Sequence, residues 1–161
     1  MTIKVGDKVP SVKLKQMTAE GVKEVSTDDF FKGKKVVLFA VPGAFTPTCS
    51  AKHVPSYLQN FDALKGKGVD EIWCLSVNDA FVMGAWSRDQ KAGGKIRFMA
   101  DGSADYSKKL GLTLDLTARG MGIRANRYSM LVDDGVVKTL NVEQPGKFEV
   151  SDGATMAKQA A

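Results

Sequence analysis

Apolar and polar positions alternate along the chain in a pattern that predicts strands followed by helices. Residues 36–41 are apolar throughout, which is typical of a strand buried on both faces of a sheet. A helix is expected over about residues 48–65, because apolar side chains then recur at helical spacing. Pro55 should bend this helix, since proline removes a backbone donor and clashes with the preceding turn. The apolar positions at this spacing are Val54, Leu58, Phe61 and Leu64.

Two more strand and helix pairs follow. Strands are predicted at residues 72–77 and 96–100, where β-branched, aromatic and other apolar residues cluster. Asn78 and Asp79 supply a cap for the helix after the first strand, and a short helix over about residues 103–110 follows the second. The central part of the chain therefore predicts a β-α-β-α-β-α order.

The ends of the chain predict hairpins. Residues 127–132 and 136–142 form two strands joined through Asp133-Asp134-Gly135, and a helix is expected at about 153–159. Near the N-terminus, short β-prone pieces flank a turn at residues 18–21. A parallel βαβ half followed by an antiparallel ββα half is the order of a thioredoxin fold. We therefore predict an α/β protein with a thioredoxin-like fold, an N-terminal hairpin extension and a central mixed sheet flanked by helices.

The composition is that of one ordinary globular domain spanning residues 1–161. Apolar residues make up 43% of the chain and charged residues 25%. No apolar stretch has the length of a signal peptide core or a membrane span, so we expect a cytoplasmic protein without membrane contact. Two cysteines are too few for a disulfide scaffold, which favours reduced thiols and redox chemistry.

The chain is basic, with a formal net charge of +5 and a pI near 9.2. The densest basic stretch, Lys32-Gly33-Lys34-Lys35, is short and has no interleaved aromatic residues on which bases could stack. We interpret it as a solvated strand entry and expect no nucleic acid partner. A positive field could still attract anionic glutathione, which is a hypothesis that ionic strength tests.

The stretch between the strand at 36–41 and its helix is the candidate site. Cys49 falls in the first helical turn, where free backbone N–H groups and the helix dipole stabilise a thiolate. A buried cysteine that happens to begin a helix is the alternative. A dithiol exchanger would have C-x-x-C here, whereas this chain has Thr46-Pro47-Thr48-Cys49, so exchange within the motif is excluded.

Pro42, Thr46 and Cys49 form the pattern P-x-x-x-T-x-x-C, which resembles the signature of the peroxiredoxins. The similarity is greatest to their type II (atypical) subfamily from plants and bacteria, and it covers nearly the whole chain. The further segments that resemble this subfamily, in the same order, are 70–72, 75–83, 99–102 and 127–130.

This resemblance implies a thiol peroxidase that reduces hydrogen peroxide and alkyl hydroperoxides through a Cys49 sulfenic acid. Such a site needs a thiolate and groups that stabilise charge on the leaving oxygen. No metal, haem or flavin cofactor is expected. A non-catalytic redox sensor or holdase is the alternative. The residues implied are the catalytic set Cys49, Thr46, Arg127 and Pro42, with Gly43 and Phe45 in the substrate pocket.

Each of these roles has a plainer alternative. Thr46 can turn its hydroxyl toward the peroxide, accepting from it and donating to the forming oxyanion, or can act as a helix cap. Arg127 begins a predicted strand and matches the family's arginine by the residues after it, although Arg119 and Arg124 are also available. The resemblance implies that Pro42 shields the thiolate from water, and otherwise it ends the strand.

His53 is the only histidine and lies four residues after Cys49, on the same helix face. A Cys–His pair is therefore possible. The family uses no histidine base, however, and no carboxylate is evident to orient this ring, so a direct catalytic role is not favoured. Two cysteines and one histidine at these spacings cannot build a zinc site.

Cys74 is the candidate resolving cysteine, because its spacing from Cys49 matches that of plant type II enzymes. It lies in a predicted central strand, however, so a bridge would require the Cys49 helix to unwind. Regeneration by glutathione or glutaredoxin is therefore favoured over an intramolecular disulfide reduced by thioredoxin. The apolar loop at residues 112–123 and Phe45 are expected to contribute to a homodimer.

Overall fold

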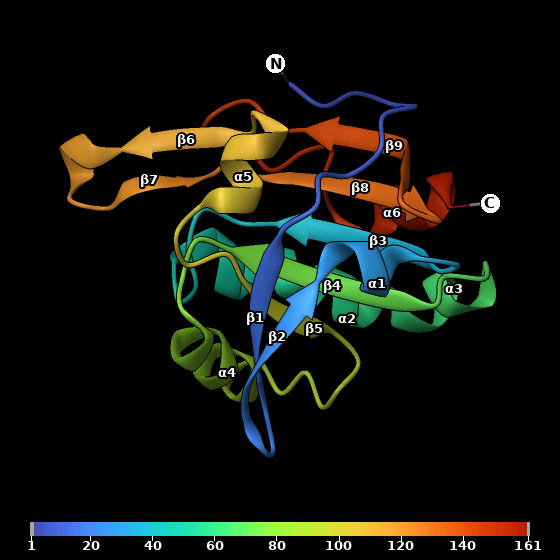
Figure 1. Cartoon of the computed structure of the whole chain (residues 1–161), viewed down its shortest axis with the longest axis horizontal. Helices are drawn as coiled ribbons and strands as arrows, with labels where there is room; N and C mark the ends of the chain where they lie inside the picture. The colour runs from blue at the N-terminus through green and yellow to red at the C-terminus, as the bar shows by residue number, and fades with distance from the viewer. Residues whose placement is uncertain (1, 161) are drawn as a thin grey trace.

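The computed structural model describes residues 2–160 and contains a seven-stranded mixed sheet flanked by helices on both faces (Figure 1). The strands are β1 (Lys13–Thr18), β2 (Gly21–Ser26), β3 (Lys35–Ala40), β4 (Glu71–Ser76), β5 (Arg97–Ala100), β6 (Thr113–Leu116), β7 (Gly122–Ala125), β8 (Tyr128–Asp133) and β9 (Val136–Val142). The helices are α1 (Thr27–Phe31), η1 (Cys49–His53), α2 (Val54–Gln59), α3 (Phe61–Gly66), α4 (Ala80–Asp89), α5 (Asp105–Leu110), η2 (Thr117–Arg119) and α6 (Gly153–Gln159).

The strand order in the sheet is β2-β1-β5-β4-β3-β8-β9. Strand β3 pairs in parallel with β4 and antiparallel with β8, so the parallel and antiparallel halves meet at β3. The predicted thioredoxin-like arrangement is therefore confirmed, and β1 of the N-terminal hairpin joins the sheet beside β5. Because β3 is central, the turn after it opens at the carboxyl ends of the parallel strands, where chemistry is usually found in such sheets.

The core forms two layers, one on each face of the sheet. Cys49 and Cys74 lie in the layer under α2, α4 and α6, together with Phe39 and Trp86. The other layer lies under α1 and α5 and includes Trp73. Because alternate residues of β3 and β4 point to opposite faces, both strands are apolar at successive positions, as the sequence indicates.

The helix predicted over residues 48–65 is divided into three pieces. Its first turn, η1, is a π-helix in which the backbone N–H of Val54 bonds to the carbonyl of Cys49. Pro55 explains the wide turn, since it cannot donate to the carbonyl four residues earlier and its ring displaces that carbonyl. A second break at Asn60 separates α2 from α3. The expected bend at Pro55 is thus a change in helix type immediately after Cys49.

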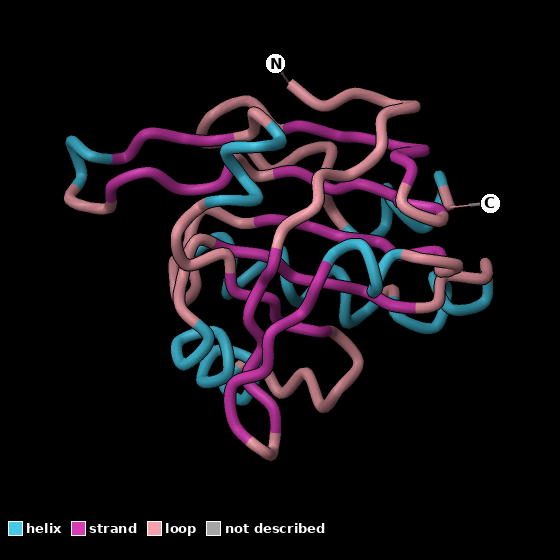
Figure 2. The backbone as a smooth tube through the Cα atoms, viewed as in Figure 1, coloured by secondary structure: helices cyan, strands magenta, loops and turns pink. Residues whose placement is uncertain are grey.

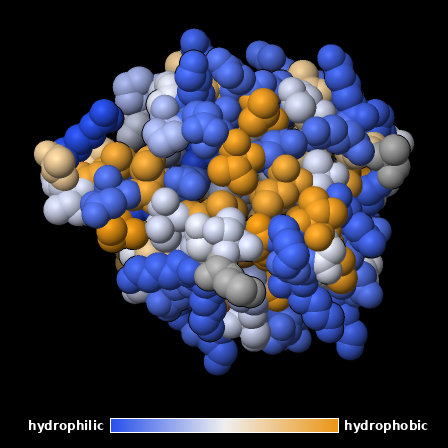
Figure 3. Space-filling view, turned by 90° about the horizontal axis from the view of Figure 1, so that it is seen from above, coloured by the Kyte–Doolittle hydropathy of each residue, from blue (hydrophilic) through white to orange (hydrophobic). Residues whose placement is uncertain are grey.

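The apolar segment expected to be a loop at residues 112–123 is instead a hairpin. Strands β6 and β7 pair antiparallel through η2 and form an arm that projects from the sheet (Figures 1 and 2). Leu114 and Leu116 face one side and Ile123 the other, because neighbouring strand residues alternate. Figure 3 shows hydrophobic side chains on the surface near this end of the molecule.

None of the helices formed by residues 2–160 is long and apolar enough to cross a bilayer.

Candidate active site

The turn from Pro42 to Thr48 is held in place by side chains from neighbouring strand ends. The backbone N–H of Ala44 donates to Asn78 Oδ1 at 3.0 Å, and that oxygen also accepts from Ser76 at 2.6 Å. Phe45 has a φ of 61°, in the left-handed region that bulky residues rarely adopt. Strain of this kind persists where surrounding contacts enforce it, and it is common at functional sites.

Cys49 begins η1 and is fully buried beneath this turn. Arg127 Nη2 donates to its sulfur at 3.2 Å. Arg127 lies just before β8, which pairs with β3, so the same sheet positions the thiol and the guanidinium. A fixed cation at hydrogen-bond distance stabilises a thiolate, which is the reactive form of cysteine.

His53 orients Arg127 rather than the sulfur. Arg127 Nη1 donates to His53 Nδ1 at 2.8 Å, and His53 Nε2 lies 3.0 Å from the carbonyl oxygen of Ser151. Since a guanidinium can only donate and a carbonyl can only accept, these contacts require the neutral ring with its proton on Nε2. The favoured interpretation, that His53 is not a direct catalytic base, agrees with this geometry.

Because His53 is neutral in the folded protein, the free energy of unfolding should depend on pH in the acid range. Burial, followed by the charge of Arg127, lowers its pKa from 6.5 to about 3. The unfolded chain therefore takes up a proton first as the pH falls below 6.5, so the free energy of unfolding decreases on acidification. We expect a slope of about 1.4 kcal/mol per pH unit over the lower part of this interval. Urea unfolding at pH 7 and pH 5 measures it.

His53→Asn is the control for this pH dependence. The variant has no histidine, and carboxylates contribute little above pH 5, so its unfolding free energy should change little between the two pH values. An equal decrease in the variant and the wild type would contradict the assignment.

The hydroxyl of Thr46 donates to the carbonyl of Gly43 at 2.6 Å. Its proton is therefore engaged within the turn, and its lone pairs are left to accept a hydrogen bond. Of the two roles expected for this hydroxyl, the structure favours the acceptor. Gly43 is buried beneath the turn, and a Cβ at this position would come within 3.1 Å of both Arg124 Nη1 and Thr46 Cγ2, so any larger residue would have to displace one of these side chains.

A cavity of about 440 Å³ opens between the turn, the β6–β7 arm and the segment after β9. Three of its lining residues, Pro42, Thr46 and Arg127, are predicted site residues, and Arg127 connects it to the Cys49 sulfur. Gly43 and Phe45 do not line it. The ring of Phe45 is about half exposed and lies 6.4 Å from that of Trp86, away from this cavity.

Cys74 lies in β4, paired with Phe39 of β3 and fully buried. It belongs to the same core layer as Cys49, and both thiols are free. Burial raises the pKa of Cys74, the nearby Cys49 adds to this increase, and Arg127 opposes it. A thiol that is both inaccessible and protonated is a poor resolving group unless β4 or η1 rearranges.

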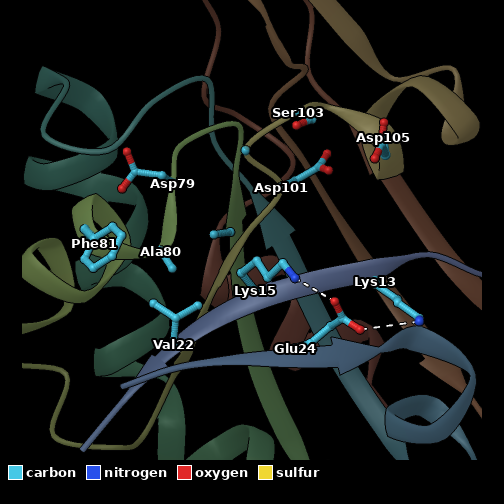
Figure 4. A pocket seen from close by; sticks show the side chains of 12 residues that line it. Lys13, Lys15, Val22, Glu24, Asp79, Ala80, Phe81, Asp101, Ser103 and Asp105 are labelled. Carbon is cyan, nitrogen blue, oxygen red and sulfur yellow. Dashed lines mark hydrogen bonds and ion pairs between the residues drawn. The ribbon is translucent and has the colours of Figure 1, made fainter. Parts of the chain in front are cut away.

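A second cavity of about 440 Å³ lies between the β1–β2 hairpin and the start of α4 (Figure 4). Several of its charged groups already serve the fold. Lys15 and Lys13 pair with Glu24 at 2.6 and 3.4 Å, and Asp79 accepts from the N–H of Val82 to cap α4. No cluster of three or more metal-ligating side chains occurs within residues 2–160.

Two residues support the site from behind: Arg124, which the sequence offers only as an alternative to Arg127, and Ser151, which it does not indicate. Arg124 donates to the carbonyls of Met121 at 2.8 Å and Pro42 at 3.3 Å, which ties the arm to the turn. The carbonyl of Ser151 fixes His53, although Ser151 is remote from it in sequence. The isolated histidine, one helical turn after Cys49, is the sequence signal for the Ser151 contact.

A thioredoxin-like fold that holds a buried thiol against an arginine defines a thiol-based redox protein. The family model described as Redoxin matches residues 4–156. Peroxiredoxin-2B of Arabidopsis thaliana is 46% identical, with 97% of each chain covered. Peroxiredoxin-2E, chloroplastic, of the same plant is 47% identical over 98% of this chain and 69% of its own length.

A solved structure, that of reduced Prx3 in complex with H2O2 from Vibrio vulnificus, is 50% identical. It has a TM-score of 0.96 and covers 99% of this chain and 100% of its own. The present chain belongs to the Redoxin family and, within it, to the peroxiredoxins. It is therefore a thiol peroxidase, and the resemblance seen in its motif is confirmed.

Proposed function

We propose that Cys49 is the peroxidatic residue and that it attacks hydrogen peroxide or a small alkyl hydroperoxide bound in the cavity above it. The observation that supports this most directly is the 3.2 Å contact between Arg127 Nη2 and the Cys49 sulfur, because Arg127 also lines the cavity together with Thr46 and Pro42. The thiolate bonds to the hydroxyl oxygen of the peroxide as the O–O bond breaks. The sulfur is oxidised to a sulfenic acid, and the leaving oxygen departs as hydroxide or alkoxide and takes a proton from solvent.

The groups around the sulfur have different roles in this step. The Thr46 hydroxyl donates its proton to the Gly43 carbonyl, so it is free to accept a hydrogen bond from the peroxide O–H and orient it. Arg127 donates to the sulfur and is placed to stabilise charge as it moves to the leaving oxygen. Pro42 forms part of the cavity wall. Because proline has no backbone N–H, it offers no donor near the sulfur to which a water molecule could bind. No bound cofactor enters this scheme.

For turnover we propose that glutathione, alone or with glutaredoxin, reduces the sulfenic acid. The first glutathione displaces water to form a mixed disulfide with Cys49, and a second thiol releases the reduced enzyme and the disulfide. Cys74 is held within β4 opposite Phe39, so an internal disulfide served by thioredoxin would require β4 or η1 to rearrange, and this favours the glutathione route. Three cations, Arg119, Arg127 and Lys147, line the cavity against the single carboxylate of Glu143, which suits an anionic thiol.

Intact mass spectrometry tests the proposed cycle. We expect the reduced protein to gain one oxygen after one equivalent of hydrogen peroxide, and to gain a glutathione adduct when glutathione follows. Cys74→Ser should behave in the same way. Loss of two hydrogens in the wild type, absent from Cys74→Ser, would make Cys74 the resolving cysteine and favour thioredoxin. An unchanged mass would contradict the assignment of Cys49.

We also propose that the protein is a homodimer that uses Phe45 and the outer face of the β6–β7 arm. Phe45 is 52% exposed and Ile123 is 38% exposed, and Ile123 faces away from the cavity side of the arm. Sedimentation velocity at micromolar concentration should show a dimer that Phe45→Ser weakens. Val22→Ser, at another exposed apolar position, is the matched control and should not alter the state. A monomeric wild type would refute the dimer.

A further inference from the structure

Glu143, just after β9, has a buried carboxylate that binds the backbone of a later segment. One oxygen, Oε2, accepts four hydrogen bonds from the segment that follows: the N–H groups of Glu149, Val150 and Ser151 at 2.8, 2.8 and 2.9 Å, and the Ser151 hydroxyl at 2.7 Å. Burial raises the pKa of Glu143, but these hydrogen bonds outweigh it and the pKa is lowered. The ionised carboxylate therefore fixes the backbone at Ser151.

The carbonyl of Ser151 leads from this carboxylate to the active site. It accepts from the Tyr57 hydroxyl at 2.8 Å and lies 3.0 Å from His53 Nε2. All three residues are fully buried, so no water competes for these contacts. The position of this one carbonyl thus selects the His53 tautomer with its proton on Nε2.

That tautomer determines what Arg127 can do. Only a bare Nδ1 can accept from Arg127 Nη1, which it does at 2.8 Å, and this contact turns Nη2 toward the Cys49 sulfur at 3.2 Å. The backbones of Glu143 and Arg127 are also in direct contact, since the N–H of Glu143 donates to the carbonyl of Arg127 at 2.9 Å. A displaced carbonyl would let the proton move to Nδ1, where it would oppose the guanidinium.

We propose that Glu143 is a positioning residue for the peroxidase reaction, acting through the Ser151 carbonyl and His53 to aim Arg127 at the Cys49 sulfur. This inference rests on the proposed role of Cys49. Glu143 touches neither the sulfur nor the guanidinium through its side chain, and its effect on the reaction is one of geometry. A misplacement of about 1 Å is enough to slow a reaction that depends on aligned donors.

The test compares Glu143→Gln and Glu143→Ala with the wild type in stopped-flow oxidation by hydrogen peroxide, at a temperature well below unfolding. We expect the second-order rate constant to fall about tenfold in the glutamine variant and further in the alanine variant. Glu149→Gln is the matched control, because that carboxylate belongs to the same segment but is exposed and pairs only with Lys147, at 3.7 Å. It should react like the wild type.

A double-mutant cycle separates positioning from a general loss of stability. If Glu143 acts through His53, Glu143→Gln should slow His53→Ala only slightly, although it slows the wild type about tenfold. Equal effects in both backgrounds would overturn the inference, as would a lower melting temperature with an unchanged rate constant. If the wild type itself shows no oxidation that depends on Cys49, the proposed function fails instead.

Discussion

Cys49→Ser should reduce peroxide consumption to the uncatalysed background, a loss of at least about 10³-fold. A serine hydroxyl is not ionised at neutral pH, and no adjacent base replaces the missing thiolate, because His53 Nδ1 is occupied by Arg127. The substitution conserves size and leaves the arginine a hydroxyl to contact. Consumption of hydrogen peroxide with glutathione in excess is the direct measurement.

Cys74→Ser is the control for this loss. It changes the other buried thiol without touching the Arg127 contact, and in the proposed cycle it retains the activity of the wild type. Substantial turnover in Cys49→Ser would show that the peroxide reacts elsewhere. Loss of activity in both serine variants, with both folded by circular dichroism, would instead require a disulfide between the two cysteines.

The sequence predicts the central sheet well, because each strand of the core carries a strong local signal. A few consecutive residues are enough to predict these elements. This holds for the apolar runs at β3 and β4 and for the Asp-Asp-Gly turn between β8 and β9. The position of Cys49 at the first turn after β3 follows in the same way. Family resemblance then places Thr46, Pro42 and Arg127 around it, and the cavity they line agrees with that placement.

What the sequence does not predict depends on contacts between distant segments. Proline at position 55 indicates a distorted helix, but whether the distortion is a kink or a π turn depends on what packs against it. The strands β6 and β7 of the arm have only four residues each, so their alternation of polar and apolar residues is too short to distinguish a hairpin from an apolar loop. The role of His53 depends on its contact with the Ser151 carbonyl, and no local sequence pattern predicts that contact.

Phe45 shows a further limit. Its place within the motif suggests a pocket residue, but it has a positive φ, its ring lies beside that of Trp86, and it does not line the cavity. Such a conformation is enforced by contacts such as that of Ala44 with Asn78, and so it follows from the fold rather than from the motif.

Arg127→Lys should reduce the rate constant for oxidation by hydrogen peroxide by about 10²-fold, even though the charge is conserved. The arginine uses two nitrogens of one planar group, with Nη1 on His53 at 2.8 Å and Nη2 on the Cys49 sulfur at 3.2 Å. An ammonium group is a single point on a flexible stem, so it can satisfy one of these partners but does not hold both in a fixed geometry.

Arg119→Lys is the matched control, because Arg119 lines the same cavity from the exposed end of the arm. It should leave the rate constant for hydrogen peroxide nearly unchanged. If Arg127→Lys also reacts like the wild type, charge alone is sufficient at this position, and the forked contact has no catalytic consequence. A loss confined to Arg127→Lys would show that the direction of the guanidinium, and not only its charge, drives the attack on the peroxide.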